Sequence, residues 1–173
     1  MKKTILFLLV LVLATGLLGC RAETPEMTES PAAQQTLPEP EILSQVPELT
    51  VSCEEDVFSV TSGNYAWSAP GENGEMSAVI ACGEHPLDRF HQKDFRVVAG
   101  QSAVLSFPAV PDEISVRCWP SSALGNTTQL ERMLTVENLT FSLEDGDWVY
   151  EITAVWERDT WNGQASYYLY LSK

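Results

Sequence analysis

The sequence predicts an all-β domain, an antiparallel β-sandwich of eight or nine strands. Three observations lead to this fold class. Apolar and polar residues alternate over many short segments, which is the period of half-buried strands. Turn residues such as Asn73-Gly74 and Asp145-Gly146 separate these segments. No helical period persists beyond about one turn, and residues 85–93 are the only helical candidate.

The strands follow from the alternation and from the turns between them. Leu49, Val51 and Cys53 occupy one phase of the first strand, and the 70–74 turn separates the second from the third. Prolines end the fourth strand, and loop 158–163 joins the last two into a hairpin. The predicted strands cover residues 49–53, 65–67, 76–81, 102–107, 114–119, 130–136, 139–143, 148–157 and 164–171. The inward set of the final hairpin is Tyr150, Ile152, Ala154, Trp156, Ala165, Tyr167, Leu169 and Leu171.

The region around Gly146 and Tyr150 resembles the tyrosine corner of immunoglobulin-like sandwiches, where a tyrosine follows a polar turn at the start of a strand. This resemblance implies a single immunoglobulin-like domain. The usual disulfide between the sheets is not expected, because segment 148–157 contains no cysteine.

The first 19 residues have the features of a signal peptide. Two lysines are followed by an uncharged run over residues 4–18, which is shorter than the roughly 20 residues of a membrane-spanning helix. The run ends in Leu17-Leu18-Gly19-Cys20, which resembles a bacterial lipobox. The resemblance implies that Cys20 is lipidated and becomes the mature N-terminus. We therefore expect a cell-membrane lipoprotein whose domain lies on the extracytoplasmic side.

Composition divides the remaining chain into a linker and a domain. Residues 20–47 comprise the lipidated cysteine and a Pro/Glu-rich segment that we expect to be disordered. Residues 48–173 contain all five tryptophans and all five tyrosines, and are long enough for one core. The net charge of −14 repels phosphate backbones, which argues against a nucleic-acid partner.

Six characteristic segments are scattered over most of the domain. They are Leu49-Thr-Val-Ser-Cys53, Gly63-Asn-Tyr65-Ala-Trp67, His85-Pro-Leu87, Pro111-Asp-Glu-Ile-Ser-Val-Arg-Cys-Trp119, Tyr150-Glu-Ile-Thr-Ala-Val-Trp156 and Gly163-Gln-Ala-Ser-Tyr167. Together these segments resemble an uncharacterised extracytoplasmic domain of Clostridia-type lipoproteins, which is also attached to membrane metallopeptidases of the β-lactam-sensor type. The resemblance implies an extracellular β-sandwich with no known catalytic residues. A sensor role does not transfer, because this chain lacks the metallopeptidase domain.

Three cysteines remain after Cys20, and their odd number leaves alternatives open. Cys53 and Cys118 fall on the apolar phase of their strands, where free cysteine behaves as a small buried hydrophobe. In an exported protein, one pair among Cys53, Cys82 and Cys118 could instead form a disulfide. A reactive thiol is the third alternative, although no basic neighbour at helix spacing lowers a thiol pKa.

Other chemistry-bearing patterns are sparse. The cluster Cys82, Glu84, His85, Asp88 and His91 contains metal-ligand types but lacks zinc-site spacing, so we predict no metal and no cofactor. The chain contains none of Gly-x-Ser-x-Gly, His-Glu-x-x-His, Ser-x-x-Lys or a Gly-rich phosphate loop. We therefore expect no enzymatic activity.

The strongest binding signal is aromatic. Trp161 lies in a polar loop, and Tyr168 and Tyr170 fall on the outward phase of their strand. Exposed aromatics would stack on a sugar, an apolar ligand or a protein partner, whereas tyrosines under a loop would only cover the sheet. We therefore expect a membrane-tethered, non-catalytic module that binds a protein or glycan. The alternatives are an accessory or sensory subunit held to a membrane partner through its sheet edge and, from another class, a metal-dependent or hydrolytic enzyme.

Overall fold

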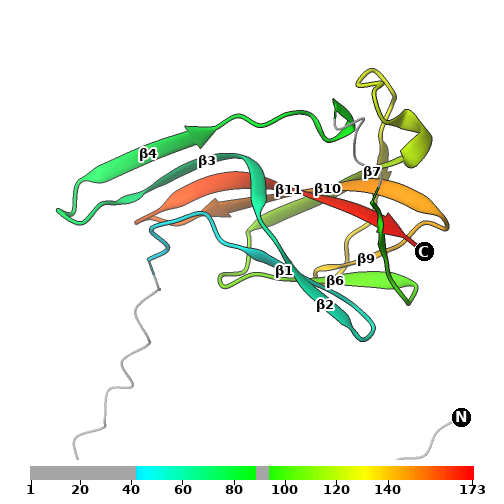
Figure 1. Ribbon diagram of the computed structural model, residues 1–173. Helices are drawn as coiled ribbons and strands as arrows, with labels where there is room; N and C mark the ends of the chain where they lie inside the picture. Colours follow the sequence, from blue (N-terminus) through cyan, green and yellow to red (C-terminus); the bar gives the residue numbers. More distant parts are fainter. Residues whose placement is uncertain (1–41, 89–93) are drawn as a thin grey trace, which may run out of the picture. The chain divides into compact units, whose positions relative to one another are not determined.

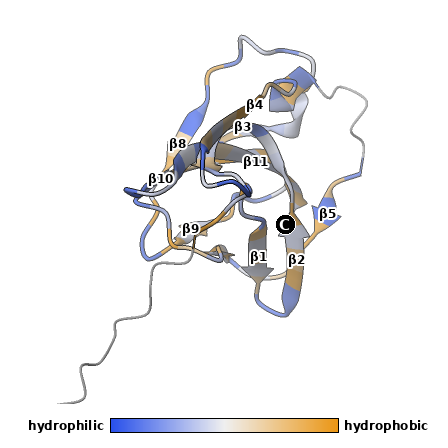
Figure 2. Cartoon of the chain, turned by 90° about the vertical axis from the view of Figure 1, so that its left-hand side faces the viewer, coloured by the Kyte–Doolittle hydropathy of each residue, from blue (hydrophilic) through white to orange (hydrophobic). Residues whose placement is uncertain are grey.

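The computed structural model describes residues 42–88 and 94–173, which form a sandwich of two sheets (Figure 1). One sheet has the strand order β2-β1-β6-β9, and the other has the order β4-β3-β11-β10-β7-β8 with β5 beside β11. Figure 2 shows β1, β2 and β9 in one layer and β3, β4, β10 and β11 in the other. The strands are β1 Leu49–Cys53, β2 Asp56–Val60, β3 Ser62–Pro70, β4 Met76–Ala81, β5 Arg96–Val97, β6 Ser102–Ser106, β7 Glu113–Pro120, β8 Arg132–Leu134, β9 Thr140–Ser142, β10 Asp147–Glu157 and β11 Asn162–Ser172.

The predicted all-β sandwich is confirmed, with two strands more than expected. Every pair of neighbouring strands in the described residues is antiparallel except β5 with β11. The additional strands are β2 and β5; β5 has only two residues, so no period can reveal it. Of the helical candidate 85–93, the described part contains only the 3₁₀ turn η1 (Pro86–Asp88), and residues 89–93 lie outside the described residues. A second 3₁₀ turn, η2, covers Ser121–Ala123.

The core lies between the sheets, and β10 and β11 contribute most to it. All eight side chains of the predicted inward set are buried, with exposed fractions of 3% or less. Trp156 contacts Trp67 and Phe107 edge-on, at ring-centroid distances of 5.4 and 5.5 Å. The alternation in the sequence therefore identified the face of this hairpin that meets the opposite sheet.

The tyrosine corner forms at the start of β10. The hydroxyl of Tyr150 accepts a hydrogen bond from the backbone N–H of Glu144 at 2.9 Å, across the turn in which Gly146 has φ +91°. In the four-stranded sheet, β6 lies between β1 and β9; in the other sheet, β10 lies between β7 and β11. Both features agree with an immunoglobulin-like arrangement.

Among the described residues, a second apolar cluster covers one end of the outer face of the larger sheet. Leu87 of η1 and Ala123 of η2 pack there with Trp119 and Val149. Beside this cluster, the buried carboxylate of Glu151 forms an ion pair with Arg117 at 2.6 Å, and the guanidinium compensates the charge of the carboxylate. Toward the β10–β11 turn, no described segment forms such a cover, and this part of the face holds the site described below.

Residues 42–47, which the sequence assigned to the end of the linker, lie against the domain. Leu43 and Val46 pack on the core, and the carbonyl of Leu43 accepts a hydrogen bond from Trp67 Nε1 at 3.1 Å. The hydroxyl of Tyr167 donates to the carbonyl of Pro47 at 2.7 Å. Among residues 42–88 and 94–173, no helix is long and apolar enough to cross a membrane.

Candidate functional site

Trp161 is a core residue, so the expectation of an exposed loop tryptophan is wrong. Its exposed fraction is 2%, and its ring stacks on Trp67 with centroids 5.3 Å apart. The Arg158 guanidinium carbon lies 5.6 Å from the centroid of the Trp161 ring. The backbone N–H of Arg158 donates to the carbonyl of Trp161 at 3.1 Å and closes the turn.

The reason for this burial was present in the sequence. Strand β11 starts at Asn162, earlier than predicted, and the inward phase of Tyr167 and Ala165 continues backwards through Gly163 to Trp161. Gly163 is required at the intervening inward position, because a Cβ there would collide with the Ala66 carbonyl and with Trp67. The two-residue period of β11, extended backwards across Asn162-Gly163, places the side chain of Trp161 on the face that meets the core.

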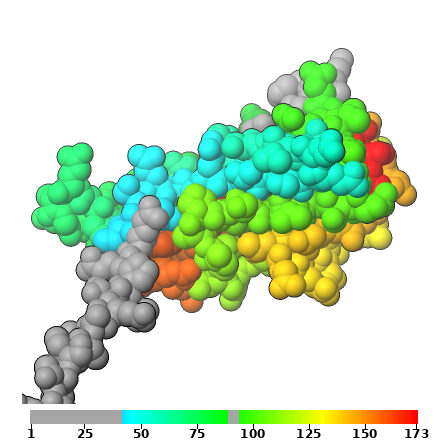
Figure 3. All heavy atoms as spheres, turned by 90° about the horizontal axis from the view of Figure 1, so that it is seen from below, coloured from blue at the N-terminus to red at the C-terminus, as the bar shows by residue number. Residues whose placement is uncertain are grey.

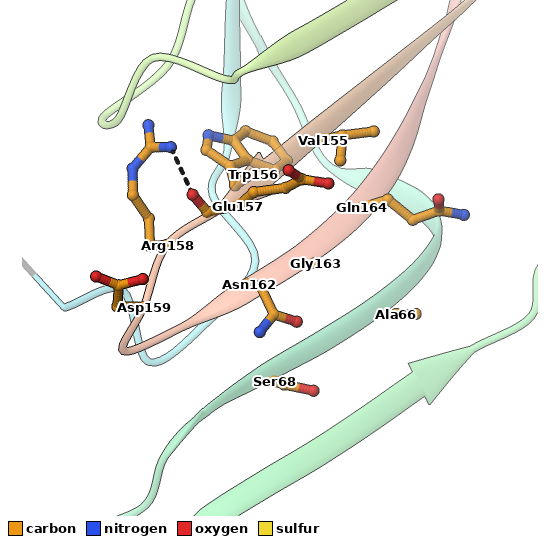
Figure 4. Close-up of a pocket in the computed structure, with 10 residues that line it drawn as sticks. All are labelled: Ala66, Ser68, Val155, Trp156, Glu157, Arg158, Asp159, Asn162, Gly163 and Gln164. Atoms are coloured by element: carbon orange, nitrogen blue, oxygen red, sulfur yellow. Dashed lines mark hydrogen bonds between the residues drawn. The ribbon is translucent and has the colours of Figure 1, made fainter.

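The loop that contains Trp161 nevertheless borders a surface depression of about 680 Å³, which we call the polar groove. Arg158 and Asp159 lie at the β10–β11 turn, and Figure 4 shows them at one end of the groove with Asn162 and Gln164 along β11. The lining residues are Ala66, Ser68, Val155, Trp156, Glu157, Arg158, Asp159, Asn162, Gly163 and Gln164. Trp161 itself lies behind the sheet and does not line the groove.

The floor of the polar groove is built from two cross-strand rows on the outer face of β10, β11 and β3. Residues directly opposite each other in an antiparallel pair point to the same face. The rows are Glu157–Asn162–Ser68, in which Glu157 lies at the rim, and Val155–Gln164–Ala66. The sheet backbone therefore fixes the spacing of one hydroxyl and two amide side chains next to small apolar residues.

The rim of the polar groove carries more negative than positive charge. The hydrogen bond from the backbone N–H of Glu157 to Asp112, at 2.7 Å, lowers the pKa of the Asp112 carboxyl, and Arg158 lowers it further. Asp112 therefore stays ionised and forms an ion pair with Arg158, whose guanidinium also donates to the carbonyl of Val110 at 2.8 Å. Glu157 and Asp159 are exposed, so the rim has an excess of negative charge.

Tyr168 points outward as predicted but is half-buried. Its hydroxyl accepts a hydrogen bond from the Asn64 amide at 2.6 Å, and Asn64 Oδ1 in turn accepts one from the Gly83 N–H. The ring lies so close to Gly63 that any Cβ there would collide with it. Tyr168 thus ties β11 to β3 and to the segment after β4.

Tyr170 is also outward and half-buried, because η1 covers it. Its hydroxyl donates to the carbonyl of Pro86 at 2.9 Å, and Phe95 meets its ring edge-on at 6.0 Å. Both tyrosines line a second depression of about 520 Å³, together with Phe58 and Arg96. The structure thus brings Tyr168 and Tyr170 together but separates them from Trp161.

The three cysteines of the described domain are free. Cys53 and Cys118 are buried in the core, where they act as small hydrophobes, and Cys82 is exposed. Burial raises the pKa of the Cys118 thiol to about 11 and also raises that of Cys53. Neither buried thiol is therefore activated as a nucleophile at neutral pH.

The metal-ligand cluster of the sequence does not assemble within the described part of the chain. His91 lies outside the described residues, and no three His, Cys, Asp or Glu side chains of the described ranges are placed to hold a metal. His85 instead accepts a hydrogen bond from the Leu87 N–H at 3.1 Å through Nδ1 and packs edge-on against Trp119. It stabilises the turn that leads into η1.

Comparison with known proteins yields no relationship: no family model, no curated protein and no solved structure matches this chain.

Proposed function

We propose that this chain is a lipid-anchored extracytoplasmic binding module without catalytic activity, and that the polar groove is its ligand-binding surface. The basic start, the short apolar run and the lipobox-like Gly19-Cys20 support the anchor. Two acyl chains on Cys20 would hold the domain on the membrane far more firmly than one chain could.

The observation that carries the proposal is the floor of the polar groove. Ser68 on β3 and Asn162 and Gln164 on the adjacent β11 project hydroxyl and amide groups, in positions fixed by the sheet register. Amide and hydroxyl side chains both donate and accept hydrogen bonds, so they suit a ligand with many hydroxyl or amide groups. The groove volume of about 680 Å³ lies within the usual range of ligand sites.

The charge of the rim restricts which class of ligand can bind in the polar groove. Glu157 and Asp159 disfavour anions, while Asp112 neutralises Arg158, the cation of the groove lining. The groove therefore fits a neutral ligand, a glycan or a peptide of the cell envelope. Tyr168 and Tyr170 line a different depression and serve as the secondary candidate surface.

The test is a binding measurement on an array of envelope glycans and neutral peptides, followed by titration of any ligand found. Gln164→Ala and Asn162→Ala should each weaken binding about 2- to 10-fold, because a net hydrogen bond contributes about 0.5–1.5 kcal/mol. Gln129→Ala is the matched control, since Gln129 is exposed in a loop and does not line the groove.

Equal binding by both groove variants and the wild type would remove the groove from the proposal. The recovered ligand should also be chemically unchanged after prolonged incubation. Cleavage of a glycan or peptide by the purified protein would contradict the non-catalytic part.

A further inference from the structure

Strand β4 is an edge strand that carries apolar side chains and projects from the domain. Among the described residues no strand pairs with its outer edge, and Figure 3 shows the β3–β4 turn protruding beyond the four-stranded sheet. All but the last of its six residues are exposed, and the exposed fractions of Met76, Val79 and Ile80 are 59%, 51% and 73%. The backbone hydrogen-bonding groups of this edge thus face solvent beside large apolar side chains.

The edge has none of the features that usually block pairing. Natural edge strands carry charges, prolines or bulges, or are very short. β4 reads Met-Ser-Ala-Val-Ile-Ala, with no charge and no proline, in a chain of net charge −14. Its register with β3 runs without a shift from Pro70↔Met76 to Tyr65↔Ala81. Such an edge is a template for an added strand.

The inner face of β4 supplies recesses for alternate side chains of such a strand. Val79 lies opposite Trp67 in the register, and segment 44–46 approaches the same face. One recess of about 280 Å³ is lined by Val79 with Tyr65, Trp67 and Val46. A second recess of about 290 Å³ lies on the other side of Val79, and Ser77 and Glu72 line it. Strand addition gains affinity from the backbone and specificity from recesses of this kind.

The charges around β4 indicate what kind of segment would bind at its outer edge. Glu72 and Glu75 precede β4, Glu84 follows it, and the whole 62–88 segment contains no Lys or Arg. We propose that the β4 edge binds an extended segment of a partner protein that has a short apolar centre and Lys or Arg at its ends. A second copy of this chain does not fit, because antiparallel pairing of β4 with itself brings the Glu75 end of one strand beside the Glu84 end of the other. This surface is separate from the polar groove, so either proposal can fail alone.

The experiment uses the full chain in nanodiscs of zwitterionic lipid, with empty nanodiscs as reference. The probe is the acetylated peptide Lys-Lys-Val-Thr-Val-Thr-Val-Lys-Lys, titrated by calorimetry or fluorescence. Val79→Lys places a charge between the recesses, and Val57→Lys makes the same change on β2, the edge strand of the other sheet. Both positions are exposed, with fractions of 51% and 64%, so both variants should keep the melting temperature of the wild type.

We expect Val79→Lys to weaken binding of the probe at least about tenfold and Val57→Lys to change it less than about twofold. Replacing the terminal lysines of the probe with glutamates should abolish binding, and so should replacing its central valine with proline, which disrupts strand pairing. Failure of the wild type to bind the lysine probe would overturn the proposal, and so would equal binding by the Val79→Lys variant. Dimers that dissociate on Val79→Lys would assign the edge to a second copy and equally contradict it.

Discussion

Truncation of Trp161 should be one of the most destabilising substitutions in the domain. The side chain is 2% exposed and stacks on Trp67. A tryptophan buries about 200 Å² of surface, and at about 25 cal/mol per Å² this corresponds to an upper bound of about 5 kcal/mol. Measured tryptophan and phenylalanine truncations in cores cost about 3–5 kcal/mol. We therefore expect Trp161→Ala to lower the free energy of unfolding by about 4 kcal/mol.

The assay is equilibrium urea unfolding of the full chain, followed by circular dichroism. Trp161→Phe keeps a ring against Trp67, so its free energy of unfolding should fall by only about 1–2 kcal/mol. This variant can be measured even if the alanine variant does not fold. Leu130→Ala is the control, since its side chain is 83% exposed and its loss should change stability by less than about 0.5 kcal/mol. A loss below about 1 kcal/mol for Trp161→Ala would refute the assignment of Trp161 to the core.

Two further predictions concern buried polar groups. Arg117→Met leaves the carboxylate of Glu151 buried without its ionic partner, and it should lower the free energy of unfolding in urea by about 3–5 kcal/mol. Arg132→Met removes an exposed ion pair and should lower the free energy of unfolding by less than about 1 kcal/mol. Equal losses in the two variants would show that burial does not distinguish the two pairs. The second prediction follows from the pKa of Cys118, which is raised by burial from 9.0 to about 11. Above pH 9 the unfolded chain releases a proton that the native thiol retains, so stability should fall as pH rises from 9 to 11, by up to about 1.4 kcal/mol per pH unit for this group. Cys118→Val should make that fall shallower, and an unchanged slope would show that the thiol does not contribute.

The sequence predicted the strands whose two faces have different environments. Along β10 and β11 one face meets the opposite sheet, so apolar residues recur at every second position, and the inward set from Tyr150 to Leu171 was predicted in full. The tyrosine corner was visible for a similar reason, because it depends on residues only six apart in the chain.

The remaining features depend on contacts between distant segments. Tyr170 is covered by Pro86, 84 residues away in sequence, and no local pattern reports such a cover. β4 was predicted as a strand, but its exposure on both faces depends on where the opposite sheet ends. The sequence does not reveal the polar groove, because its floor combines residues of β3, β10 and β11 that are distant in the chain and carry no aromatic signal. The position of Trp161 was predicted wrongly because the Asn-Gly pair is a turn signal, which delays the predicted start of the last strand to Gln164, whereas β11 starts at Asn162.

Metabolic labelling with a radioactive fatty acid tests directly whether Cys20 anchors the protein to the membrane. Wild-type protein expressed in a bacterial host should carry the label and sediment with membranes. Cys20→Ala should lose the label and move to the soluble or unprocessed fraction. Its β-type circular dichroism and its melting temperature should stay unchanged, since residues 21–47 separate Cys20 from the domain in the sequence. Equal labelling of the wild type and the Cys20→Ala variant would contradict anchoring through Cys20.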